Sequence, residues 1–395
     1  MKAAVLAVSL ALATAACSGD AAPDAYAGAQ VDTLPDGVVH VRNPPIDADA
    51  SPRWRIEPEV VIGAADGEGP EVFGQIRGVA PLPDGRIAVL DAQAQEVRIF
   101  AADGAHDRTF GGQGQGPGEF AGANGMVLGH DGVLRVHDPR NSRLSFLHPD
   151  SGYLRSTPVQ IMSWGFLWGA VVDEQDRVYE ESMVGSLSEQ WWSIKVYDAR
   201  GAWVDTVQIY KYDPDSTDGE DGLYRYDRGA SGVPFWPRGV YALDAAGYYW
   251  RKPPDVNAYR IVQSTFEGDT LRIFEAERPV QPVPPDSVDA AIEVLRERAG
   301  RELDWSRIPS DMPLVETIFR DDRGRVWVRV NTADPELTTF DVFSAEGVYE
   351  GSAVTALRIP TYWKPAIVGD QFYTMQTDDF DVPYVVRARI REVGG

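Results

Sequence analysis

Apolar and polar residues alternate with a period of two over most of the chain, and Asp-Gly turns interrupt the alternation at short intervals. This pattern is typical of antiparallel β-strands joined by tight turns. Residues 78–104 align with residues 125–152, so that Asp91 falls on Asp138, 47 residues later. Each unit contains three or four strands, and strand groups that recur every 40 to 50 residues or so indicate the blades of a β-propeller.

Weaker copies of this unit continue to the end of the chain, at residues 166–201, 236–275, 314–358 and 365–391. Two stretches do not repeat and are predicted insertions, at about 205–235 and 278–315. The remaining length corresponds to six units of roughly 45 residues. The sequence therefore predicts an all-β fold over residues 52–395, a six-bladed β-propeller of antiparallel four-stranded blades.

The last of these units is one strand short. Residues 54–62 (WRIEPEVVI) have a β pattern and lie ahead of the first unit, where no other strand needs them. An open sheet edge invites aggregation, and closing the ring removes it. We therefore expect residues 54–62 to form the outermost strand of the blade that contains residues 365–391.

One short helix is predicted within the second insertion. Residues 286–303 place three apolar side chains at helical spacing, with Asp286 or Ser287 in position to cap the start and Gly300 near the end. The segment lies between the fourth and fifth blades. We expect it on the surface, where it can cover one mouth of the central channel.

The N-terminus has the features of an export signal. Residues 1–16 contain one basic residue followed by an apolar run of about 14 residues, too short to span a membrane. The single cysteine, Cys17, follows directly, and the surrounding AACSGD resembles the lipoprotein cleavage box of bacteria. This resemblance implies that Cys17 is lipidated. The segment that follows is rich in Ala, Asp, Pro and Gly, so residues 17–51 are predicted to form a tether, with one strand-like piece at 38–41. The alternative is ordinary secretion, which leaves Cys17 as a free thiol.

The composition limits the possible partners. A formal net charge of −23 argues against nucleic acid, which needs a basic surface. No second apolar run of 18 residues follows the signal, so the membrane is expected to be reached only through the N-terminal lipid. The predicted location is the bacterial cell envelope, on the outer membrane or facing the periplasm.

A glycine-rich stretch, GGQGQGPGEF at residues 111–120, does not fit any phosphate-binding loop. Its GxGxGxF pattern precedes a strand, an Asp-Gly turn and a V-x-D strand end, and residues 114–147 resemble the NHL repeat. The chain from about Val38 is similar to bacterial six-bladed propeller lipoproteins of that superfamily, in GVVHVRNPP near the start and DVPYVVRARI near the end. The resemblance implies that the glycines connect neighbouring blades, and it implies no particular chemistry.

Binding sites of propellers usually lie at the mouth of the channel, where chain segments enter the inner strands. Here those segments carry aromatic and cationic side chains, which suit a sugar, a carboxylate or an acidic peptide. The alternative is that the tryptophans pack between blades and the cations pair with local acids. The predicted ligand-binding residues are Arg77, Trp168, Trp236, Arg238 and Lys364.

A metal-dependent reaction is the alternative function. Six-bladed gluconolactonases and paraoxonases hold a divalent cation in the channel, but the mouth segments here supply only Glu119, Asn124 and Glu316. The acidic stretch 213–222 resembles a calcium loop only loosely and is interpreted as a solvated loop. We therefore assign no catalytic residue, no metal ligand and no cofactor, with calcium left open, and the five histidines are expected to be ordinary surface or packed residues.

Two functions remain open from the sequence. The favoured one is a monomeric envelope lipoprotein that presents its propeller to a protein, peptide or saccharide, without catalysis. The other is a hydrolase, lactonase or lyase that uses a metal ion in the channel.

Overall fold

The computed structural model describes residues 28–159, 167–186, 189–212, 222–226, 229–237, 240–244, 248–252 and 259–393. The predicted signal peptide, Cys17, Arg238 and the acidic loop up to residue 221 lie outside these ranges. Among the described residues, no helix has the length and apolar character needed to cross a membrane.

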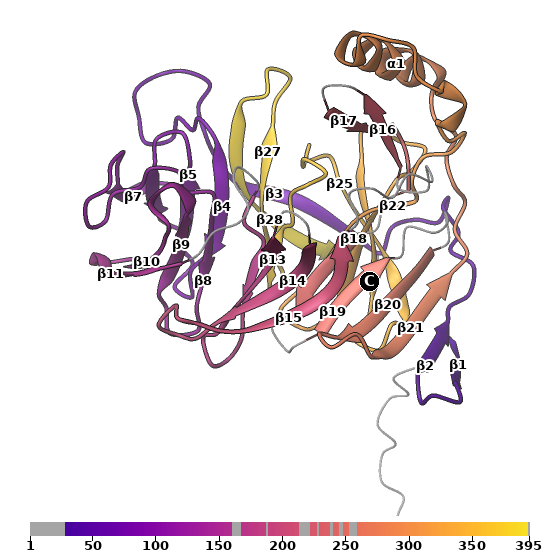
Figure 1. Ribbon diagram of the computed structural model, residues 1–395, viewed down its shortest axis with the longest axis horizontal. Coiled ribbons are helices and arrows are strands. Elements are labelled where there is room, and N and C mark those ends of the chain that lie inside the picture. The colour runs from indigo at the N-terminus through magenta and orange to yellow at the C-terminus, as the bar shows by residue number, and fades with distance from the viewer. Residues whose placement is uncertain are drawn as a thin grey trace, which may run out of the picture.

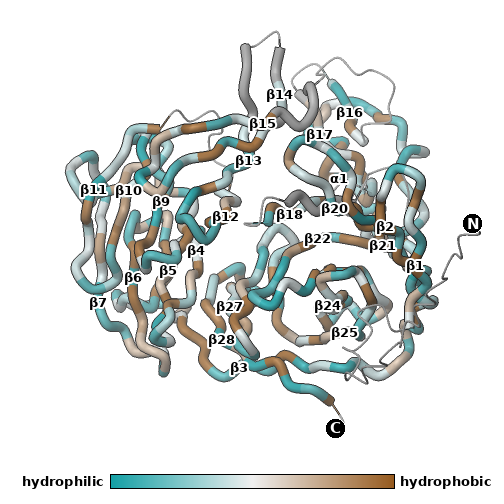
Figure 2. Tube along the Cα trace, turned by 90° about the horizontal axis from the view of Figure 1, so that it is seen from below, coloured by the Kyte–Doolittle hydropathy of each residue, from teal (hydrophilic) through white to brown (hydrophobic). Residues whose placement is uncertain are grey.

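Six blades surround a central opening, which Figure 2 shows from below. The first strand of each blade lies innermost, and neighbouring inner strands contact one another around the ring. Blades 1 to 3 consist of β4 (Ile76–Pro81), β5 (Ile87–Asp91), β6 (Glu96–Phe100) and β7 (His106–Gly111); β8 (Gly125–Leu128), β9 (Leu134–Asp138), β10 (Arg143–His148) and β11 (Gly152–Pro158); and β12 (Ala170–Val172), β13 (Val178–Ser186), β14 (Glu189–Tyr197) and β15 (Trp203–Tyr212). Blades 4 to 6 consist of β18 (Val240–Asp244), β19 (Tyr248–Lys252), β20 (Tyr259–Thr265) and β21 (Thr270–Ala276); β22 (Val315–Arg320), β23 (Val326–Val330), β24 (Thr338–Phe343) and β25 (Tyr349–Thr355); and β26 (Ala366–Val368), β27 (Gln371–Thr377), β28 (Pro383–Glu392) and one strand from the N-terminal region.

That N-terminal strand, β3 (Trp54–Ile62), closes the ring. It pairs antiparallel with β28, from Trp54 opposite Glu392 to Ile62 opposite Val385. Two residue pairs also join it in parallel to β25, so blades 5 and 6 share one eight-stranded sheet. The predicted closure by residues 54–62 is confirmed.

A second N-terminal segment extends blade 4. The hairpin of β1 (Gln30–Thr33) and β2 (Val39–Arg42) adds to this sheet because β2 pairs in parallel with β21. Val38 and Val41 are buried against the blade. Residues 30–42 are therefore part of the folded domain, and the prediction that they belong to a tether of residues 17–51 is corrected here.

The two insertions differ in detail from the prediction. β15 continues to pair with β14 as far as Tyr212, with two shifts of register, so the first insertion does not begin at about 205. The second contains α1 (Pro285–Ala299), which ends at Gly300 with a left-handed φ of 65°. The predicted cap is wrong: the N-cap residue is Pro284, without a side-chain hydrogen bond, and Pro285 at the first helical position suits the helix start.

The helix α1 lies on the upper face of the propeller, at the upper right of Figure 1. Its buried Leu295 packs on Tyr224 and Val233, at the hairpin of β16 (Leu223–Tyr226) and β17 (Gly229–Gly232). Figures 1 and 2 together place α1 over blade 4, to one side of the central opening. The helix therefore does not cover the channel mouth, in contrast to the expectation.

The repeated aspartates have a structural role. Asp91, at the end of β5, accepts hydrogen bonds from the backbone N–H groups of Gly74 and Gln75. Asp138 does the same for Ala121 and Gly122 in the next blade. Each aspartate thus fixes the segment that leads into the inner strand of its blade, which explains their repeat along the sequence.

The glycine-rich stretch turns the chain between blades 1 and 2. Gly111 has a φ of 104°, and a Cβ atom there would lie 2.8 Å from the Phe120 ring. Phe120 N–H donates to the Gly112 carbonyl oxygen, which closes the turn. The glycines therefore act as a close-packed connector.

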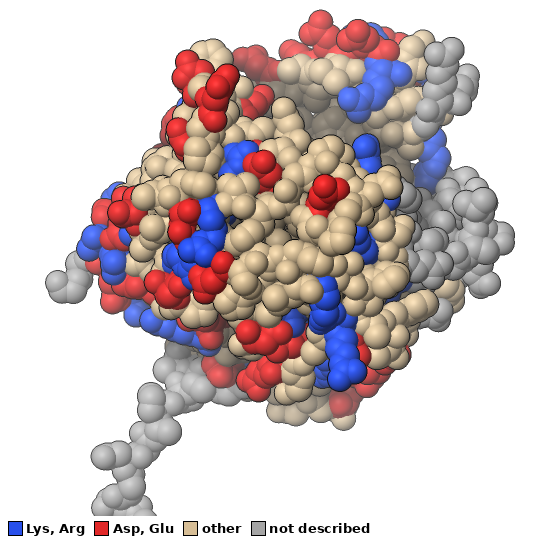
Figure 3. All heavy atoms as spheres, turned by 90° about the vertical axis from the view of Figure 1, so that its left-hand side faces the viewer, with Lys and Arg blue, Asp and Glu red and all other residues tan. Residues whose placement is uncertain are grey.

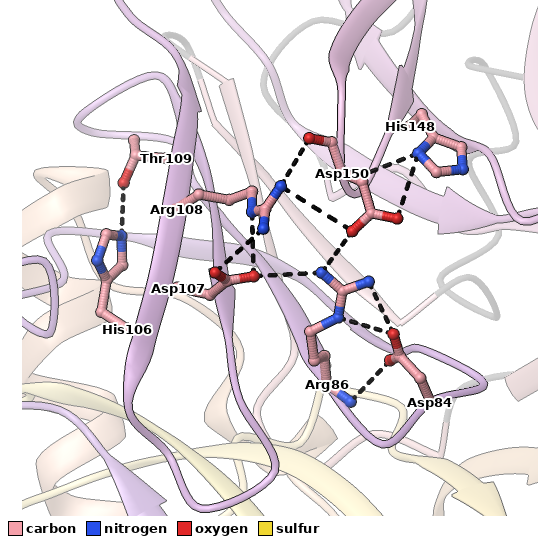
Figure 4. A network of polar contacts seen from close by, with 8 residues as sticks. All are labelled: Asp84, Arg86, His106, Asp107, Arg108, Thr109, His148 and Asp150. Carbon is pink, nitrogen blue, oxygen red and sulfur yellow. Dashed lines mark hydrogen bonds and ion pairs between the residues drawn. The ribbon is translucent and has the colours of Figure 1, made fainter.

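Ion pairs join the outer parts of blades 1 and 2 (Figure 4). Arg86 contacts Asp84 at 2.7 Å and Asp107 at 3.2 Å in its own blade, and Asp150 of blade 2 at 2.8 Å. Arg108 also pairs with Asp107, at 3.0 Å. On the face formed by these blades, acidic and basic side chains are intermixed without a continuous basic area (Figure 3).

Candidate functional site

The four predicted ligand-binding residues that the structure describes do not converge on one place. Trp168 is buried between blades 2 and 3, where its ring stacks on His137 with a centroid distance of 4.9 Å. Its Nε1–H donates to a Glu180 carboxylate oxygen at 2.9 Å. Trp168 therefore packs between blades, which is the alternative that the sequence left open.

The polar groups around Trp168 form a buried cluster. His137 Nδ1 lies 2.8 Å from Asn124 Oδ1, and Lys195 is also buried there. Burial and the Lys195 charge lower the pKa of His137 to about 3, so this imidazole is neutral at ordinary pH. Burial raises the pKa of Glu180, against the effect of its hydrogen bond from Trp168. Asn124 is thus engaged inside the fold and is not presented to the channel as a metal ligand.

Trp236 lies under the insertion that carries α1. It packs against the cluster formed by Tyr224, Val233 and Leu295, and the Arg307 guanidinium lies 5.8 Å from its ring centroid. Its position over blade 4 separates it from Trp168, and Arg238 lies outside the described residues.

Lys364 crosses the central opening. It follows the connector between blades 5 and 6, and its Nζ donates to the Tyr241 carbonyl oxygen of β18 in blade 4 at 2.8 Å. Leu167 of blade 3 also packs against the core cluster of blades 1, 5 and 6. Among the described residues, side chains of blades 3 and 6 therefore reach toward other blades at this level.

Glu181 of β13 faces Lys364 in this region. Burial raises the pKa of Glu181 to about 7, and the Lys364 charge opposes the shift. The protein that surrounds Lys364 lowers the pKa of its ammonium to about 8, although the side chain still touches solvent, and Glu181 opposes that shift. The pair thus contains two groups that titrate near neutral pH. Lys364 was predicted as a ligand-binding residue from the sequence, whereas Glu181 was not.

A pocket of about 690 Å³ lies on the upper face over blade 6, flanked by blades 1 and 5. The hairpin between β27 and β28, which rises at the top of Figure 1, forms one wall. The connector of residues 357–362 forms another, and the start of β4 brings Arg77 to the blade 1 side. The volume is within the range of small-molecule sites, about 300–1,000 Å³.

Most cations of the pocket are already paired. Arg329 contacts Glu316 at 2.8 Å and donates to the Ile359 carbonyl oxygen, and Arg358 pairs with Asp379. Arg77 differs: among the described residues it forms no ion pair and no side-chain hydrogen bond. It is therefore the cation that can receive an anion without losing a partner.

Exposed aromatic side chains accompany Arg77. Tyr362 lines the pocket and is 61% exposed, and Phe380 at the tip of the β27–β28 hairpin is 87% exposed. Neither residue is among the ligand-binding residues predicted from the sequence. Tyr362 lies in a mouth segment, next to a tryptophan and a lysine, so its position could have marked it as a binding residue. The sequence around Phe380 contains no such indication.

The residues considered as metal ligands have other partners. Glu119 accepts the Gly116 N–H at 2.7 Å within the connector, and Glu316 pairs with Arg329. In the part of the chain that the structure describes, no three metal-ligating side chains come together. The geometry therefore offers no built metal centre there.

Known proteins share the fold at low sequence identity. Residues 72–146 match a family of six-bladed β-propellers, DUF5128. A solved structure of an exported protein from Bacteroides fragilis is similar with a TM-score of 0.51 and 10% identity, over 90% of this chain and 100% of that chain. A DUF4221 member from Bacteroides vulgatus gives a TM-score of 0.49 and 10% identity (86% and 99%). Virginiamycin B lyase from Staphylococcus aureus gives 0.41 and 12% (91% and 98%).

No curated protein sequence matches the chain. At such identities the structural similarity concerns the fold and not the chemistry. The chain is a six-bladed β-propeller, and its first two blades carry the sequence match to a propeller family.

Proposed function

We propose that this protein is a non-catalytic binding propeller of the bacterial cell envelope, and that its pocket over blade 6 holds a small ligand with a carboxylate group. The observation that carries the proposal is Arg77, whose guanidinium lines a pocket of about 690 Å³ and has no ion pair or side-chain hydrogen bond with any described residue. A guanidinium binds a carboxylate through two parallel hydrogen bonds, which gives both energy and orientation.

Attachment to the membrane by a lipid on Cys17 fits this arrangement. The β1–β2 hairpin, the first described part of the chain, lies at the lower end of the molecule in Figure 1, whereas the β27–β28 hairpin is at the top. An anchor that precedes β1 would thus leave the pocket facing away from the membrane. Export and lipidation also fit the sequence of residues 1–17.

Calorimetric titration with N-acetyl-L-alanine, a small monocarboxylate, tests the proposal. Replacement Arg77→Ala should abolish binding, and Arg77→Lys should weaken it, because an ammonium cannot present the planar fork. Arg55→Ala is the matched control, since it removes an equal charge from an exposed position on β3. Equal binding by wild type and Arg77→Ala, or ester hydrolysis that EDTA abolishes, would overturn the proposal.

A further inference from the structure

We infer that the natural ligand of this pocket carries an ammonium group as well as a carboxylate, as a free amino acid or a short peptide does. The inference rests on the proposed function for the carboxylate half. It adds a second recognition element, on the other walls of the same pocket.

Two acidic side chains line the same pocket from the other blades. Asp381 comes from the β27–β28 hairpin of blade 6, and Glu336 comes from the loop between β23 and β24 of blade 5. Both are exposed, and within the described residues neither forms an ion pair or a side-chain hydrogen bond. The pocket thus holds one unpaired cation and two unpaired carboxylates on different walls.

The Asp381 carboxylate is not needed to form its own turn. Asp378 organises the hairpin: it accepts the N–H groups of Phe380 and Val382 and the hydroxyl of Tyr384. Asp381 itself adopts a left-handed φ of 61° at the tip, a conformation that aspartate tolerates better than most residues. Its carboxylate is therefore available for a ligand.

Glu336 is in the same situation. Asp334 holds its loop by accepting the Glu336 N–H at 3.0 Å, while the Glu336 side chain contributes no hydrogen bond. Glu336 lines the same pocket as Arg358; the hydrogen bond to Asp379 raises the pKa of Arg358, and the Glu336 charge adds to that shift. Because Arg358 already pairs with Asp379, it does not neutralise the carboxylate of Glu336, which keeps its negative charge.

This charge pattern makes a plain anion a weaker ligand than a zwitterion that carries the same carboxylate. A carboxylate bound to Arg77 would be repelled by Asp381 and Glu336 and by the net charge of −23. An ammonium group on the same ligand turns that repulsion into attraction. The exposed ring of Tyr362 gives the ammonium a further favourable contact, because aromatic faces attract cations. The volume leaves room for more than a free amino acid, so a dipeptide is expected to make more contacts with the walls than a free amino acid does.

The test is calorimetric titration of the purified protein with L-alanyl-L-alanine, its N-acetyl form, its C-terminal amide and free L-alanine. We expect the dipeptide to bind at least about tenfold more tightly than either blocked form. Free alanine should bind more weakly than the dipeptide and show the same dependence on Arg77, Asp381 and Glu336.

Variants separate the two halves of the site. The double replacement Asp381→Asn and Glu336→Gln should weaken the dipeptide about tenfold and leave the N-acetyl form unchanged or tighter. Glu267→Gln, in an exposed turn of blade 4, is the control for a loss of negative charge. Arg77→Ala should weaken both ligands.

Each contrary result has a defined meaning. If the N-acetyl form binds as tightly as the dipeptide and the acidic variants have no effect, the zwitterion inference is wrong and the carboxylate pocket stands. If the C-terminal amide binds best and Arg77→Ala is without effect, the proposed function fails as well. Absence of binding by all four probes overturns both.

Discussion

Replacement of Ile62 by alanine tests the closure of the ring by β3. Ile62 is 3% exposed at the end of this strand, where it pairs with Val385 and packs in the core cluster shared by blades 1, 5 and 6. An Ile→Ala change at such a site costs about 2–5 kcal/mol, because it removes apolar contacts and leaves a cavity. The neighbouring Val61 points outward and is 52% exposed, so Val61→Ala should change stability by no more than about 0.5 kcal/mol.

Deletion of residues 51–63 extends the same test. β3 buries Trp54, Ile56 and Ile62, whose loss together corresponds to about 7–15 kcal/mol. That amount is comparable to the whole stability of a typical domain, about 5–15 kcal/mol, and the deletion also opens the edge of β28. We therefore expect aggregation or loss of cooperative unfolding.

Urea denaturation followed by tryptophan fluorescence and circular dichroism measures both effects. Closure of the ring by β3 is contradicted if Ile62→Ala lowers the free energy of unfolding no more than Val61→Ala does. It is refuted equally by a chain that begins at Glu71 and unfolds like the full mature protein.

Three further predictions concern other parts of the molecule. Replacement Arg86→Met leaves Asp84, Asp107 and Asp150 without their shared cation. In urea unfolding the variant should lose about 1 kcal/mol of unfolding free energy relative to wild type at low salt, and the difference should shrink at high salt. A difference that does not depend on salt would contradict the network. Because the pKa of Glu181 is raised from 4.5 to about 7, folded Glu181 retains a proton that the unfolded chain loses, and stability should fall by about 1–3 kcal/mol as pH rises through this window. Glu181→Gln should make the free energy of unfolding less dependent on pH in the same assay. If the pH dependence does not change, another group causes it and the prediction is wrong. Cys17→Ser should move the protein from the membrane fraction to the soluble fraction of the producing bacterium, and mass spectrometry of wild type should find a lipid on Cys17.

The blades and their closure could be predicted because their signals are local. Alternation within 78–104 and 125–152 marks strands, and the missing strand of blade 6 points to residues 54–62 by elimination. The docking of β2 has no such signal, since its parallel partner β21 lies more than 200 residues away in sequence and both are short.

The site could be predicted only in part, for a geometric reason. Alternation shows that two faces of a strand differ, but not which face meets the neighbouring blade. Trp168 turns into the junction of blades 2 and 3, and Lys364 crosses to blade 4, so neither reaches the pocket. Arg77 does reach it, while Asp381 and Glu336 come from hairpins outside the segments that were considered.

The N-terminal strands β2 and β3 belong to blades 4 and 6, so the protein cannot finish folding until those blades have been synthesised. During synthesis β2 must wait for β21, and β3 must wait for β28, whose Glu392 pairs with Trp54. Such long sequence separations slow folding, because the chain between the partners loses entropy before any contact forms. A nascent chain thus holds β2 and β3 without these long-range partners through most of its production. A chain that stops before β28 has no antiparallel partner for β3, so synthesis of residues 383–392 is a condition for a closed propeller.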